Sequence, residues 1–94
     1  LMSCGPAFLA LVVEAMVDAG VRHGLQADDA RKLAIETMAG TAATLGELGI
    51  EPYELRRRVT SPGGSTARGL AALEDRGLRS AFMDAVTAVV EGTR

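Results

Sequence analysis

The sequence is poor in cysteine and in aromatic residues, with one cysteine, one tyrosine, two phenylalanines and no tryptophan. Because a disulfide joins two cysteines, Cys4 has no partner within the chain. This excludes the disulfide-stapled class of small secreted domains and favours a cytoplasmic protein. With so few aromatic rings, a core must consist mostly of alanine, leucine, valine and methionine. Side chains this small predict helices that pack close together.

The chain also lacks a strong charge excess, a membrane segment and a metal-binding pattern. Its formal net charge is −2, whereas nucleic-acid binders usually carry a basic face. The apolar stretch 6–21 contains Glu14 and Asp18 and is shorter than the roughly 20 uncharged residues that a membrane span needs. One histidine and one cysteine cannot supply a chelating set. We therefore expect no nucleic-acid, membrane or metal partner.

The abundant residues predict a helical globular domain. Hydrophobic residues make up 48% of the sequence, which is enough to bury a core and offset the entropy lost on ordering the chain. They recur at spacings of three and four, and no stretch alternates as a strand does. The pattern predicts an all-α fold, a small five-helix bundle that forms a single domain over residues 1–94. The expected helices begin near residues 6, 27, 52, 66 and 78 and end near residues 20–24, 49, 59, 76 and 91.

The first expected helix carries apolar residues on every face, and its only polar side chains are those of Glu14 and Asp18. A helix in a small domain ordinarily keeps one polar face, so a helix of this kind must be covered on most sides. We expect a second copy of the chain to cover it, in an obligate and interlocked homodimer. The alternative is a central helix within a monomer. The apolar positions are Phe8, Leu9, Leu11, Val12, Val13, Met16 and Val17.

One segment, Thr60–Thr66, which we call the Pro-Gly-Gly loop, carries the residues most suited to binding chemistry. Gly63 and Gly64 can adopt positive φ, Pro62 fixes the approach of the chain, and a helix is expected to follow directly. Such a bend gathers free backbone N–H groups beside serine and threonine hydroxyls, an arrangement suited to a phosphate or carboxylate. The alternative is a plain turn in which Ser65 caps the helix.

Several ordered segments resemble the C-terminal domain of pyrroline-5-carboxylate reductases. Residues 3–8, Ser-Cys-Gly-Pro-Ala-Phe, are similar to the family's Gly-Ser-Gly-Pro-Ala-Tyr, and residues 14–21 to its helix Glu-Ala-(Leu/Met)-x-Asp-Ala-(Gly/Ala)-Val. Residues 59–66, Val-Thr-Ser-Pro-Gly-Gly-Ser-Thr, resemble the family signature Val-Thr-Ser-Pro-Gly-Gly-Thr-Thr. Gly69-Leu70 and Leu73-Glu74 follow in the order that the family shows. The resemblance covers nearly the whole chain.

The resemblance implies an enzyme that uses NADPH or NADH to reduce 1-pyrroline-5-carboxylate to proline. In that family an N-terminal Rossmann domain binds the nicotinamide cofactor, and the helical domain interlocks with its twin in a homodimer or a higher oligomer. By similarity Ser61, Gly63, Gly64 and Thr66 would hold the carboxylate of the small-molecule substrate, and no catalytic residue is assigned. The chain contains no Gly-x-Gly-x-x-Gly. We therefore expect a fragment that lacks the Rossmann domain, binds no cofactor and is inactive alone.

Two departures from the family pattern lie near the expected site. Ser3-Cys4-Gly5 stands where reductases carry Gly-Ser-Gly, and with the Pro-Ala-Phe that follows it is similar to the reductase-like late competence proteins. Arg57 stands where reductases usually have an aspartate. The alternative is therefore a non-catalytic dimerisation module of a reductase-like paralogue, such as a late competence protein.

Overall fold

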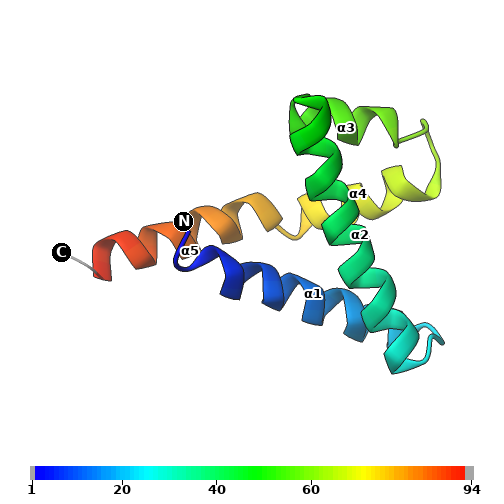
Figure 1. The fold of residues 1–94 in the computed structure, drawn as a ribbon, viewed down its shortest axis with the longest axis horizontal. Coiled ribbons are helices and arrows are strands. Elements are labelled where there is room, and N and C mark those ends of the chain that lie inside the picture. The colour runs from blue at the N-terminus through cyan, green and yellow to red at the C-terminus, as the bar shows by residue number, and fades with distance from the viewer. Residues whose placement is uncertain (1, 93–94) are drawn as a thin grey trace. The chain divides into compact units, whose positions relative to one another are not determined.

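The computed structural model describes residues 2–92, which form five α-helices and no strand (Figure 1). The prediction of an all-α chain with five helices is therefore confirmed. The chain divides into two compact units, residues 1–50 and residues 51–94. The first unit contains α1 (Gly5–Arg22) and α2 (Ala27–Leu48). The second contains α3 (Pro52–Arg58), α4 (Ser65–Asp75) and α5 (Leu78–Gly92).

Proline and glycine residues set several of the helix ends. Pro6 and Pro52 lie in the first turns of α1 and α3, where a backbone N–H has no helical acceptor and its absence costs nothing. α2 ends at Gly49, which adopts a left-handed conformation with φ of 63° and donates its N–H to the carbonyl of Leu45 at 3.0 Å. These signals are local in the sequence, and each predicted helix end agrees with the structure to within one residue or falls within the predicted range.

The turn between α1 and α2 is a Schellman motif. Gly24 has a φ of 107° and donates its N–H to the carbonyl of Val21 at 3.1 Å. Leu25 donates its N–H to the carbonyl of Gly20 at 3.0 Å. These two bonds satisfy carbonyls that the end of α1 leaves without helical partners, and they bring α2 back against α1.

The contact between α1 and α2 depends on small residues. The only buried apolar residues of the described chain are Ala30 and Ala34 of α2, each 4% exposed. A Cβ added at Gly20 would lie 3.3 Å from the Cβ of Ala30 and 3.1 Å from the side chain of Leu25. Gly20 therefore permits the close approach of the two helices.

The sequence of α2 contains two interior glycines, Gly40 and Gly46, which are tolerable if their missing side chains let another helix approach. Among residues 2–92, nothing lies within 4 Å of a Cβ built at either glycine, so neither glycine admits another helix there. α2 continues through both positions without a break. Their small size serves no packing contact in the single chain.

Each unit contains a helix that carries exposed apolar side chains, α1 in the first unit and α5 in the second. α1 contains no buried residue, and Leu11 is 65% exposed. In α5, the helical spacing predicts that Phe82, Met83, Val86, Val89 and Val90 face inward. Val86 is half-buried, but the other four are exposed, and Met83 is 70% exposed. Several large hydrophobic side chains exposed on one helix indicate a surface for association with another molecule. No helix among residues 2–92 is long and apolar enough to cross a bilayer.

Candidate anion-binding site

The Pro-Gly-Gly loop contains a type II β-turn over residues 61–64. Pro62 occupies the second position, and Gly63 occupies the third with a φ of 70°, a conformation that glycine adopts without steric cost. Gly64 closes the turn by donating its N–H to the carbonyl of Ser61 at 3.0 Å. The Gly64 amide is therefore engaged within the loop, and it is the carbonyl of Gly64 that accepts the first helical bond of α4, from the N–H of Arg68 at 3.1 Å.

The N-terminus of α4 is not capped by a side chain. Gly64 occupies the N-cap position in an extended conformation, with φ of −80° and ψ of 178°. The alternative in which Ser65 caps the helix is wrong, because Ser65 is the first helical residue. The N–H groups of the first turn, residues 65–67, have no helical acceptor by construction. Their dipoles make this end of α4 attractive to an anion.

The structure gathers all four predicted substrate-binding residues at this helix end. Ser61 and Gly63 lie in the β-turn, Gly64 is the N-cap, and Thr66 is in the first turn of α4. Ser61, Gly63 and Thr66 are exposed, and Gly64 is half-buried. Within the described residues, neither the Ser61 nor the Thr66 hydroxyl forms a hydrogen bond. Both hydroxyls can therefore donate to a ligand at the helix end.

Arg68 contacts the loop and was not identified from the sequence. Its guanidinium Nη1 donates a hydrogen bond to the carbonyl of Gly63 at 2.9 Å. A long side chain with several rotatable bonds can reach many backbone groups, so this contact had no recognisable sequence signal. Arg68 takes part in no ion pair within residues 2–92.

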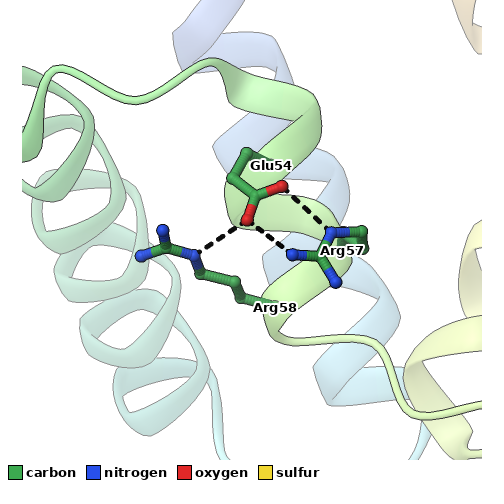
Figure 2. A network of polar contacts seen from close by, with 3 residues as sticks. All are labelled: Glu54, Arg57 and Arg58. Carbon is green, nitrogen blue, oxygen red and sulfur yellow. Dashed lines mark hydrogen bonds and ion pairs between the residues drawn. The ribbon is translucent and has the colours of Figure 1, made fainter.

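A compact ion cluster occupies the preceding helix, α3 (Figure 2). Arg57 donates to both carboxylate oxygens of Glu54, at 3.0 and 2.7 Å, and Arg58 donates to one of them at 3.1 Å. These hydrogen bonds, first from Arg57 and then from Arg58, lower the pKa of Glu54 to about 2. Arg57, which stands where reductases usually have an aspartate, is thus a cation that forms an ion pair with Glu54. Arg56, the third arginine, forms no such bond within the described chain.

An open groove of about 440 Å³ adjoins the loop. It is lined by residues of α3, the loop and α4, namely Tyr53, Arg56, Arg57, Thr60, Pro62 and Leu70. The groove brings two arginines and the Pro62 side of the turn to one surface. This surface carries more positive than negative charge, which suits an anionic ligand better than a neutral one.

The described residues do not form the parts of a dinucleotide or metal site. Binding of a dinucleotide in a Rossmann fold requires a strand, a glycine-rich turn and a helix, and residues 2–92 contain helices only. No group of three or more histidine, cysteine, aspartate or glutamate side chains comes together within these residues. What the described residues do form at the start of α4 is an uncapped helix end, which suits an anion.

Comparisons with known proteins give the context of this site. The chain matches, over residues 1–94, the family model described as pyrroline-5-carboxylate reductase dimerisation. It is 49% identical over 90 residues to a pyrroline-5-carboxylate reductase of Treponema pallidum, covering 96% of this chain and 34% of that protein. It is 40% identical over 94 residues to the protein of the same name from Glycine max, and the match covers 100% of this chain and 34% of that protein. The chain thus spans about a third of the length of these relatives.

A solved structure shares the fold. The crystal structure of Plasmodium falciparum pyrroline carboxylate reductase with NADP bound superposes on this chain with a TM-score of 0.92. The sequence identity is 34%, and the match covers 96% of this chain and 34% of the other.

Proposed function

Because this chain belongs to the pyrroline-5-carboxylate reductase dimerisation family, we propose that it is the helical domain of a cytoplasmic reductase that converts 1-pyrroline-5-carboxylate to proline. The reaction is the last step of proline synthesis and uses NADPH or NADH. The relatives are named for this activity, and one of them was crystallised with NADP. Reduction of the ring requires hydride from a nicotinamide, for which the residues described here form no site, so this chain alone is expected to be inactive.

The uncapped N-terminus of α4 beside the Pro-Gly-Gly loop is the observation that carries the proposal. We assign Ser61, Gly63, Gly64 and Thr66 to the substrate carboxylate. The free N–H groups of the first turn and the hydroxyls of Ser61 and Thr66 are all donors, which is the set that a carboxylate needs. Gly64 contributes through its N-cap conformation and its lack of a side chain, because its own N–H is bonded to Ser61. The role of this segment is to hold and orient the substrate.

The assignment is tested by kinetics of the complete protein with Ser61→Ala and Thr66→Ala. A hydrogen bond to a charged group typically contributes enough free energy that its loss should raise the KM for 1-pyrroline-5-carboxylate about tenfold. Thr66→Ser, which keeps the hydroxyl, should recover most of the loss. Ser80→Ala, in the exposed first turn of α5, is the matched control and should leave the KM unchanged.

Two results would contradict parts of the proposal. Unchanged KM values in Ser61→Ala and Thr66→Ala would remove the loop as the carboxylate site. A folded complete protein without reductase turnover would instead support the non-catalytic dimerisation module of a reductase-like paralogue.

We further propose that the chain acts as an interlocked homodimer. The family is described by dimerisation. Among residues 2–92 the only buried apolar residues are Ala30 and Ala34, while α1 and α5 contain no buried residue and carry several exposed apolar side chains. A second copy supplies a matching apolar surface of the same kind, as in obligate homodimers whose interfaces resemble a divided core.

A further inference from the structure

Arg68, the fourth residue of α4, donates hydrogen bonds to both carbonyls of the Gly63–Gly64 pair, one from its backbone and one from its side chain. Its backbone N–H donates to the Gly64 carbonyl at 3.1 Å, and its Nη1 donates to the Gly63 carbonyl at 2.9 Å. A free carbonyl oxygen next to an anion site repels the anion, because its partial charge is negative. Arg68 engages both oxygens and so removes this repulsion from the loop.

The peptide between Gly63 and Gly64 is held at both of its polar ends. Arg68 binds its oxygen, and the carbonyl of Ser61 accepts its N–H at 3.0 Å. A peptide between two glycines has no Cβ on either side to restrain its rotation, so without these bonds it would sample several orientations. These two hydrogen bonds fix the bend before a ligand arrives. Hydrogen-bond donors that are already fixed bind a ligand more tightly than donors that must be ordered on binding.

Arg68 also adds positive charge where the helix already has it. The dipole of α4 makes its N-terminus positive, and acidic residues are the usual occupants of a first turn. α4 has no acidic residue there and no side-chain cap. The Arg68 guanidinium has no ion-pair partner among residues 2–92. The helix end thus combines two sources of positive potential, and among residues 2–92 the Arg68 guanidinium is paired with no carboxylate.

We propose that Arg68 is a positioning residue that makes the Pro-Gly-Gly loop selective for a carboxylate over a neutral ligand of the same shape. Its bond to Gly63 holds the bend, and its charge favours the anionic ligand. The inference rests on the proposed function, which supplies the small carboxylate as the ligand. It assigns the selectivity to a side chain that lies outside the Pro-Gly-Gly loop itself.

The test compares two ligands that differ in charge at one group, L-proline and L-prolinamide, by calorimetric titration of the complete protein. Arg68→Ala should weaken L-proline binding about three- to tenfold and change L-prolinamide binding less, because only L-proline carries the carboxylate. Arg68→Lys, which keeps the charge and one donor, should restore part of the selectivity. Arg76→Ala, at the other end of α4, removes the same charge from a side chain without a hydrogen bond and should leave the ratio of affinities unchanged.

Kinetics separates this inference from the proposed function. In an active reductase, Arg68→Ala should raise the KM for 1-pyrroline-5-carboxylate and leave kcat close to its native value, since the proposed role of Arg68 is to hold the loop that binds the carboxylate. A complete protein that lacks reductase turnover overturns the proposed reaction, while the proline-to-prolinamide ratio still decides the role of Arg68. The inference would be overturned if Arg68→Ala left the ratio of L-proline to L-prolinamide affinity unchanged, or if Arg76→Ala lowered that ratio equally. It would also be overturned if the native protein did not prefer L-proline.

Discussion

Glu54 illustrates how single side chains set the charge around the site. Its carboxylate accepts three hydrogen bonds from Arg57 and Arg58, and these lower its pKa from 4.5 to about 2. A group whose pKa is lower in the folded chain stabilises the fold above its unfolded pKa. That contribution is therefore complete above about 4.5 and is lost as the pH falls towards about 2. The effect on stability is small, because Arg57 and Arg58 are 70% and 53% exposed and salt screens such pairs.

The Glu54 prediction is checked by following its carboxyl carbon by NMR as the pH is lowered. We expect a midpoint near 2 in the native chain. The midpoint should rise in Arg57→Gln, which removes the partner that makes the largest contribution. Arg56→Gln is the matched control, because it removes the same charge from the same helix without breaking a bond to Glu54. Equal midpoints in the native chain and in Arg57→Gln would show that the ion cluster does not form in solution.

At the scale of elements, two glycines six residues apart should respond in opposite ways to the same substitution. Gly63 has a φ of 70°, and Gly69 lies within α4, while a Cβ at either position would meet nothing within 4 Å. An added Cβ thus has free space at both glycines, and the two positions differ in backbone conformation. Gly63→Ala should destabilise the fold by about 1 kcal/mol, because alanine is strained in the left-handed region. Gly69→Ala should stabilise it by about 0.5–1 kcal/mol through helix propensity.

Denaturant unfolding of the two variants measures this difference directly. Because both substitutions add one methyl group, the difference in unfolding free energy isolates the conformation of the loop. A Gly63→Ala variant as stable as Gly69→Ala would mean that the turn does not hold Gly63 at positive φ.

The helices could be predicted from the sequence because their ends are marked locally. Proline at Pro6 and Pro52 and the left-handed glycines at Gly24 and Gly49 act within one turn of the residue that carries them. The loop was found for the same reason. The N-cap was misplaced by one residue because both glycine and serine are acceptable there, and only the backbone angles decide between Gly64 and Ser65.

Features that depend on which segments meet in space could not be predicted. Gly20 permits the approach of α2, whereas Gly40 and Gly46 meet no described residue, and the sequence does not state which glycine faces another helix. The bond from Arg68 to Gly63 was missed for a related reason, since it depends on the rotamer of a long side chain. The substrate role of Ser61 and Thr66 stays a prediction.

For the whole molecule, α1 is the helix that we expect to form the dimer interface. Leu11 is 65% exposed in the single chain, on a helix with no buried residue. If a second copy covers α1, Leu11→Asp places a carboxylate in an apolar interface without a partner, and the dimer should weaken by at least about tenfold. Sedimentation of the complete protein at micromolar concentration should then show monomer for Leu11→Asp and dimer for the native sequence.

The matched control for the dimer prediction is Gln26→Asp. It adds the same charge at the N-cap of α2, where aspartate is a favoured residue, so the fold should be unharmed and the dimer retained. A native dimer that persists in Leu11→Asp would show that α1 lies outside the interface. A native protein that is monomeric would remove self-association altogether, and would require another surface to cover the exposed faces of α1 and α5. The comparison thus tests self-association, which a chain with so small a core needs in order to fold stably.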